Sequence, residues 1–268
     1  MVNTRCIQSR YSFDVTVAGL AMSPRFNHLA IAFAAIVAIM LLMPAAGARA
    51  YQAETVKGGG TISGTVKFNG APPPRKPVEI SKDREVCGAV PHYDESLVVA
   101  PDGGIANAVI SITDIASGAP LIPLKHVKFD QKNCEYRPRV LAFPAGSTVD
   151  VVNSDGILHS VRTESKHNPA LDIAQPPFKR VIELPVKDAD LIGVSCDAHN
   201  WMHGWWFVAD NPYYAVTDAA GHFTIKDVPP GTYTLRVWQE KLGTETRKVT
   251  VEPGKTVTVD FTMASGKG

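Results

Sequence analysis

The chain has 268 residues, of which 45% are hydrophobic and 20% are charged, and its formal net charge is +1. This length allows one or two domains with a hydrophobic core, and the near-neutral mixed composition excludes a nucleic-acid-binding surface and a largely disordered chain. The 21 glycines and 20 prolines are spread along the sequence, which is typical of many short strands joined by turns.

Residues 1–50 have the order of features found in a secretory signal. Arg25 and His28 precede an apolar run at 29–43, and a small-residue stretch ends at Ala50. The run of about 15 residues is short for a bilayer span of about 20. We therefore expect cleavage near Ala50 and a periplasmic or secreted protein, with an uncleaved N-terminal anchor as the alternative. Met22 is an alternative translation start, so residues 1–21 are not required for this interpretation.

The chain after residue 50 is predicted to be all-β. Residues 51–60 are expected to be a flexible linker. Periodicity of two and β-branched residues predict the first strands, and residues 163–177 are expected to be a polar loop. No helical periodicity extends beyond two turns. The predicted strands of this part lie at 61–68, 97–99, 108–113, 126–129, 140–143, 148–152 and 178–184.

The segment 195–204 contains a candidate metal site. Cys196, His199 and Met202 offer a thiolate, an imidazole and a thioether within seven residues, and a tight loop between two strands can direct all three toward one point. Two histidines, one cysteine and a weak axial methionine form the blue-copper ligand set. We expect the second histidine to be His159, which follows the predicted strand at 148–152 and the turn at 153–156.

These motifs resemble the cupredoxins, in which the first ligand follows such a turn and the other three share one loop. The spacing Cys-x2-His-x2-Met is similar to the ligand loop of amicyanins, and residues 130–159 resemble exported plastocyanin-like proteins of the methylamine-utilisation type. The resemblance covers residues 61–210. It implies a cupredoxin-like Greek-key sandwich with one copper ion, which carries electrons or copper and meets a redox partner protein.

The ligand loop departs from this family in its residue types. Asp197, Ala198 and Asn200 stand where amicyanin loops carry prolines, and Ser160 stands where an asparagine usually follows the first histidine ligand. The prolines stiffen the loop and the asparagine ties the two ligand strands together. None of these departures removes a ligand.

Several alternatives to this site stay open. Cys196 and His199 can be a buried thiol beside a core histidine, which would leave a degenerate copper fold in an exported binding module. A red-copper-like centre with an open position would have His203 or a carboxylate in place of Met202. Zinc prefers four strong ligands, and methionine is a poor one for it. No general acid/base pair accompanies the ligands, so we expect no enzyme.

Three cysteines remain after the predicted cleavage, namely Cys87, Cys134 and Cys196. With Cys196 assigned to the metal, the other two are expected to pair in an oxidising compartment. Such a disulfide closes a loop of about 50 residues and stabilises the fold by about 4 kcal/mol on chain-entropy grounds. Two free thiols, or a second metal site with His92, are the alternatives.

Three tryptophans, Trp201, Trp205 and Trp206, lie around the ligand loop. We expect them to pack in the core and to keep water away from the copper. The alternative is an apolar docking patch, through which the exposed edge of His199 would pass electrons to a partner protein.

Residues 213–263 form a second predicted module with strands at 214–217, 222–225, 231–239, 246–251 and 256–261. Their motifs resemble the carboxypeptidase regulatory-like domains, which are transthyretin-type β-sandwiches also classed with carbohydrate-binding-like folds. The resemblance implies a fold and leaves the ligand, a glycan or a protein, open. Tyr213, Tyr214 and Trp238 are the aromatic candidates for a sugar. Because five strands make a thin sandwich, we expect the module to pack on the copper domain or to borrow strand 61–68.

Overall fold

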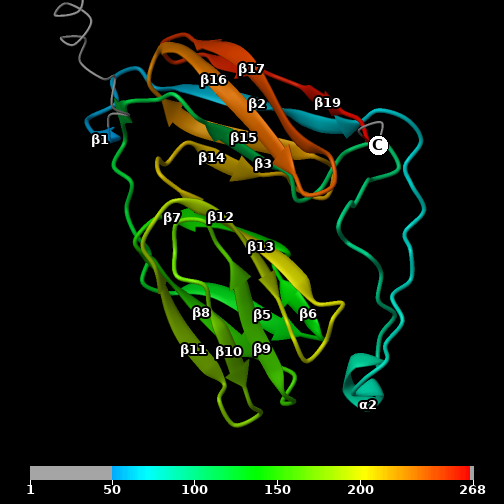
Figure 1. Ribbon diagram of the computed structural model, residues 1–268. Helices are drawn as coiled ribbons and strands as arrows, with labels where there is room; N and C mark the ends of the chain where they lie inside the picture. The colour runs from blue at the N-terminus through cyan, green and yellow to red at the C-terminus, as the bar shows by residue number, and fades with distance from the viewer. Residues whose placement is uncertain (1–49, 266–268) are drawn as a thin grey trace, which may run out of the picture. The chain divides into compact units, whose positions relative to one another are not determined.

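The computed structural model describes residues 50–265 (Figure 1). Residues 1–49 of the predicted signal segment, including Cys6, lie outside this range, so export stays a prediction. Within the range, no helix is long and apolar enough to cross a bilayer. The all-β fold class is confirmed, since the regular elements of residues 50–265 are strands apart from the short helix α2 (Arg84–Cys87).

Two sheets form a sandwich that contains the predicted metal residues. Side chains from both sheets meet in one buried cluster, and β8 shows the alternation of buried and half-buried positions that a period of two produces. The first sheet has the order β10 (Asp172–Gln175), β9 (His159–Glu164), β12 (Asp190–Ser195), β13 (His203–Ala209) and β7 (Val140–Pro144). The second has the order β11 (Val181–Val186), β8 (Ser147–Asn153), β5 (Val127–Lys132) and β6 (Glu135–Arg137).

A second sandwich contains the C-terminal residues, and its two sheets share their own buried cluster. One sheet has the order β14 (Tyr214–Val216), β3 (Val109–Ile112), β16 (Gly231–Gln239) and β17 (Gly243–Val251). In the other, β2 (Gly60–Phe68) lies between β15 (His222–Val228) and β18 (Thr256–Thr258), and it also pairs with β19 (Phe261–Met263). Figure 1 shows β2 in blue beside β15 and the red C-terminal strand β19.

The sheets do not follow the predicted division into residues 61–210 and 213–263. Strands β2 and β3, which precede the metal-bearing sandwich in sequence, pair with strands of the C-terminal module. Ile62 and Val66 of β2 and Ile110 of β3 are fully buried in the core of that module. The strands after residue 213 could not cover both faces of this core alone, which explains why the module takes the strand at 60–68.

Smaller elements also differ from the prediction. Residues 52–53 of the expected linker form β1 (Gln52–Ala53), which pairs with β4 (Ser117–Gly118). The expected polar loop contains β10, and strands β6, β9, β12 and β13 had no predicted counterpart. The predicted strand at 97–99 is not a regular strand, since Val99 forms only an isolated bridge with Ile105. A third buried cluster joins strands of the two sandwiches through Val109 of β3, Val140 of β7 and Phe207 of β13.

Candidate metal centre

The register of two neighbouring strands positions the candidate ligands. β12 pairs antiparallel with β9, with Ser195 opposite Arg162. Continuing this register past the end of β12 brings the ligand loop beside the first residues of β9, where His159 lies. The loop residue Asp197 donates its backbone N–H to the Ser160 hydroxyl at 2.7 Å, so the two strands stay joined where they reach the site.

Three of the four predicted ligands converge on one point. His159 Nδ1 and His199 Nδ1 are 3.1 Å apart, and Cys196 Sγ lies 4.0 Å from the first and 3.8 Å from the second. Ligand atoms that share one ion at about 2.0–2.3 Å lie about 3 to 4 Å from one another. Both histidines are 0% exposed and Cys196 is 3% exposed, so this cluster of donors is shielded from water.

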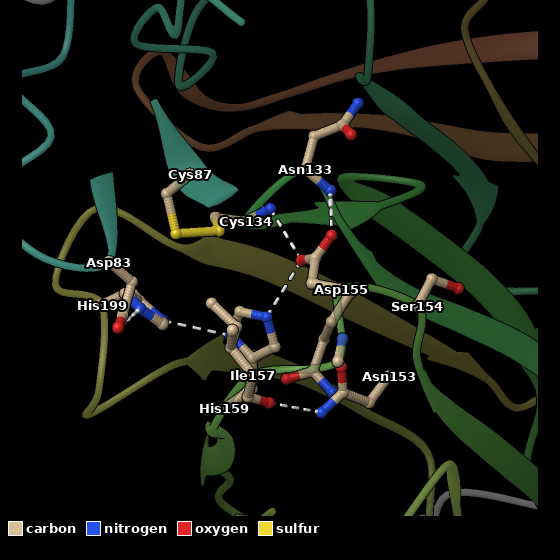
Figure 2. A network of polar contacts seen from close by, with 12 residues as sticks. Asp83, Cys87, Asn133, Cys134, Asn153, Ser154, Asp155, Ile157, His159 and His199 are labelled. Atoms are coloured by element: carbon tan, nitrogen blue, oxygen red, sulfur yellow. Dashed lines mark hydrogen bonds and ion pairs between the residues drawn. A yellow bond between two sulfur atoms is a disulfide. The ribbon is translucent and has the colours of Figure 1, made fainter. Parts of the chain in front are cut away.

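Each histidine is held from its far side by a carboxylate (Figure 2). Asp155 Oδ2 lies 3.0 Å from His159 Nε2, and Asp83 Oδ2 lies 2.8 Å from His199 Nε2. An ionised carboxylate can only accept a hydrogen bond, so both Nε2 atoms carry the hydrogen. Metal-binding histidines commonly have such outer carboxylate partners, which fix the tautomer and the ring orientation.

This tautomer leaves an electron pair on each Nδ1, and the two pairs face each other beside a thiol. Two imidazole acceptors 3.1 Å apart repel unless a cation lies between them or one ring takes up a second proton. The arrangement of donors therefore fits a soft metal ion. The pKa of His159 is raised: burial lowers it, but hydrogen bonds to Asp155 and Cys196 outweigh the burial.

The surroundings of Cys196 favour its thiolate form. Burial raises the pKa of the thiol, but hydrogen bonds with His159 and His199 and from the Ser160 backbone N–H lower it further, from 9.0 to about 5. The Ser160 N–H donates to Sγ at 3.2 Å. Ser160 thus links the two ligand strands through both its backbone and its hydroxyl.

Met202 packs in the same buried cluster as Cys196 and is 1% exposed. Its backbone closes the loop, since its N–H donates to the His199 carbonyl at 3.0 Å and its carbonyl accepts from Cys196 N–H at 3.2 Å. His203, the alternative ligand, is exposed and its Nε2 lies 2.9 Å from the Asn200 carbonyl. Met202 therefore lies within the buried cluster that contains Cys196, whereas His203 lies outside it.

The three tryptophans do not form a common docking patch. Trp206 is 0% exposed and packs edge-on against Phe129 and Phe143, as expected for a core residue, so the alternative of docking does not apply to it. Trp205 packs against Trp238, and Trp201 lies beside the His199 ring and donates to the Cys134 carbonyl.

The alternative of an electron exit through an exposed edge of His199 does not fit this structure either. The imidazole is completely buried, and its outer nitrogen is bonded to Asp83. Tyr213, a candidate for sugar binding, is likewise buried at 1% exposure, and its hydroxyl oxygen accepts a hydrogen bond from the Ala119 backbone N–H at 2.7 Å.

Cys87 and Cys134 form the predicted disulfide, and Cys196 is the free cysteine of the described residues. His92 is not part of a metal cluster. Its Nδ1 lies 3.0 Å from a Glu135 carboxylate oxygen and its Nε2 lies 2.6 Å from the Cys87 carbonyl. Because both cysteines are in the disulfide and both ring nitrogens have partners, the alternatives of two free thiols and of a second metal site are excluded.

Two residues of the site, Asp83 and Asp155, were not predicted from the sequence. Asp155 precedes His159 by four residues, but in Ser-Asp-Gly it has the pattern of an ordinary turn. Asp83 belongs to a polar stretch far from the ligand loop in sequence. No local pattern signals its contact with His199, because only the fold brings the two segments together.

Comparison with known families supports one part of the predicted resemblance. The family model of the carboxypeptidase regulatory-like domain matches residues 208–264, so the resemblance of the C-terminal module is confirmed. No curated protein matches the chain.

Solved structures similar to the chain include three copper proteins. A reduced Cu(I) form of an amicyanin mutant is 20% identical over 33% of this chain and 86% of its own, with a TM-score of 0.29. A purple cupredoxin from Nitrosopumilus maritimus is 20% identical over 32% and 99%, with a TM-score of 0.26. A copper-containing nitrite reductase from Thermus scotoductus SA-01 is 20% identical over 37% and 25%, with a TM-score of 0.28. At these values the similarity says nothing about a metal in this chain, and the case for one rests on the site itself.

Proposed function

We propose that this chain is a mononuclear copper protein of the cupredoxin type that carries electrons or copper outside the cytoplasm. In this proposal His159, Cys196 and His199 would hold one copper ion, Met202 would offer a weak thioether donor, and the protein is not an enzyme. The observation that carries the proposal is the buried convergence of two Nδ1 atoms and one thiolate, with both Nε2 atoms occupied by carboxylates.

The donor types favour copper over other ions. One thiolate, two imidazoles and a nearby thioether suit copper, whereas zinc sites are usually completed by a fourth strong ligand. The described residues offer no such ligand within the cluster that contains Cys196. The neighbouring group of Cys134, Asp155 and His159 does not compete, because Cys134 is in a disulfide.

The chain's residues hold the site in one arrangement. The disulfide, the carboxylate contacts and the Ser160 links restrict both histidines and the thiolate from several directions. Bound copper would supply one-electron redox chemistry there, and a fixed donor set reduces the rearrangement that accompanies a change of oxidation state. The redox partner would be another exported protein.

Loading with copper tests the proposal. Cu(II) is added to the purified metal-free protein, excess metal is removed by dialysis, and visible absorption and EPR spectra are recorded for wild type and Cys196→Ser. We expect an intense thiolate-to-copper band in the wild type that the variant lacks. His222→Gln serves as the control, since His222 is exposed on the other sandwich. Loss of all copper from the wild type on dialysis would contradict the proposal, and a copper signal that binds azide would favour the open-position alternative.

A further inference from the structure

A strap formed by residues 76–94 covers one side of the metal site. Backbone bonds from Val78 N–H to the His92 carbonyl and from Asp94 N–H to the Lys76 carbonyl close its base. The Cys87–Cys134 disulfide fastens it to the turn between β5 and β6, and the contact of His92 with Glu135 fastens it to β6. Figure 2 shows Asp83 of this strap beside His199 and the disulfide nearby.

Asp83 stands at the N-cap position of helix α2 but does not cap it. An aspartate in this position usually accepts a bond from the first backbone N–H groups of its helix. Here it makes no side-chain capping bond and its backbone is left-handed, with φ 49°. Such a conformation is uncommon for a residue other than glycine. The carboxylate turns away from α2 and binds His199 Nε2 at 2.8 Å.

The carboxylate lies between His199 and solvent. The side chain of Asp83 is 38% exposed while that of His199 is 0% exposed. The strap thus shields the Nε2 edge of His199 from solvent, and it fixes the tautomer that leaves His199 Nδ1 free to face Cys196.

We propose that Asp83 is a positioning residue for the metal site: it holds His199 with Nδ1 available as a ligand and slows the escape of the bound ion along this edge. The metal part of this inference rests on the proposed copper site. Losing an outer-shell partner of a ligating histidine typically weakens metal binding 10- to 100-fold, and we expect an effect of about this size for Asp83→Ala.

The test compares three variants of the full chain with the wild type. Asp83→Ala removes the acceptor, and Asp83→Asn keeps an oxygen acceptor but removes the charge. Glu85→Gln removes the same charge from an exposed position in the same helix. Both positions are exposed, so we expect the fold to tolerate the changes. The ring nitrogens of His199 in the metal-free protein are observed by ¹⁵N NMR, and copper affinity is measured by competition with a chromophoric chelator.

We expect the wild type, Glu85→Gln and Asp83→Asn to keep the hydrogen of His199 on Nε2, and Asp83→Ala to show a mixture of tautomers. Copper affinity should fall in Asp83→Ala by about 10- to 100-fold, with faster transfer to the chelator, and Asp83→Asn should lie in between. An Asp83→Ala protein with the wild-type tautomer and with copper affinity equal to that of Glu85→Gln would overturn the inference. The tautomer is read without copper, so a wild type that binds no copper would overturn the proposed function alone, and the NMR result would still decide the role of Asp83.

Discussion

At the scale of single residues, Cys196 is distinguished from the other two cysteines of the described chain by its surroundings. It is buried, receives the Ser160 N–H, and faces two imidazoles. These contacts stabilise the negative sulfur more than burial destabilises it, so its pKa is lowered to about 5. Because the thiolate is the form of cysteine that binds metals, Cys196 can act as a soft metal ligand without first losing a proton.

The ionisation of this thiol can be measured directly. In the metal-free protein, we expect absorbance near 240 nm to show a thiolate that is present at pH 7 and disappears as the pH falls through about 5, because the folded pKa of Cys196 lies well below 9.0. Cys196→Ser should lack this transition. A thiol that ionises only above pH 8 would contradict the described contacts.

Ser160 gives a second test at this scale. Its hydroxyl accepts the backbone N–H of Asp197 at 2.7 Å and is buried. Ser160→Ala should destabilise the metal-free protein by about 1–2 kcal/mol, because it leaves a backbone donor unpaired. Urea unfolding measures this loss, and Ser165→Ala, at a site remote from the ligand loop, shows the effect of losing a serine hydroxyl elsewhere. An unchanged unfolding midpoint would show that the hydroxyl does not tie the strands together.

The candidate metal ligands could be predicted from the sequence, but the carboxylate that hydrogen-bonds to His199 could not. Cys196, His199 and Met202 are neighbours in one motif, and the turn before His159 has a recognisable pattern, so these residues could be found by chemistry and spacing. Asp83 could not, because an aspartate in a polar stretch is as compatible with a solvated loop as with a histidine contact. Its role depends on tertiary structure.

At the scale of elements, the strap at 76–94 contains little regular structure and depends on cross-links. Helix α2 has only four residues, too few to be stable by itself. The disulfide joins it to the turn between β5 and β6, where Cys134 N–H also donates to Asp155. Both carboxylates that hold the histidines are thereby connected to this one covalent link.

Removing the disulfide should therefore affect stability and the site together. We expect the Cys87→Ser, Cys134→Ser double variant to lose about 4 kcal/mol of unfolding free energy, from the entropy of the loop that the disulfide closes. Urea denaturation measures the loss, with the reduced wild type as the control. The His199 ring should also lose its fixed tautomer. A double variant with wild-type stability and an unchanged His199 spectrum would show that the strap is held by its other contacts alone.

Sequence patterns explain only some of the missed strands, since β9, β12 and β13 were also not predicted, although β12 and β13 contain several apolar residues. β8 has a clear alternation of buried and half-buried positions, and the C-terminal strands are separated by Gly and Pro turns. β10 and β6 are short and polar, with Asp172 and Glu135 at their starts. Such strands are formed by pairing with a neighbour rather than by their own propensity.

At the scale of the whole molecule, the second sandwich is assembled from distant parts of the chain. Its central strand β2 pairs with β15, β18 and β19, and β3 lies between β14 and β16. The family match begins at residue 208 and so includes neither strand. Sequence similarity located the module but not its complete boundary, since strand borrowing leaves only a weak local signal.

This discontinuity predicts the behaviour of a fragment. Residues 208–265 alone should not fold, because they lack β2 and β3, whose side chains Ile62 and Ile110 are part of the buried core. Circular dichroism and the dispersion of amide signals in NMR spectra would show this, with residues 50–265 as the folded control. A fragment with well-dispersed signals and a cooperative thermal transition would mean that β2 and β3 are dispensable.

X-ray absorption at the copper edge of the loaded protein tests the central claim most directly. The account predicts one copper per chain with a short sulfur neighbour and two imidazole nitrogens, and it predicts that Cys196→Ser loses the short sulfur neighbour. A wild-type copper surrounded by nitrogen and oxygen alone, with a spectrum that Cys196→Ser leaves unchanged, would contradict the account.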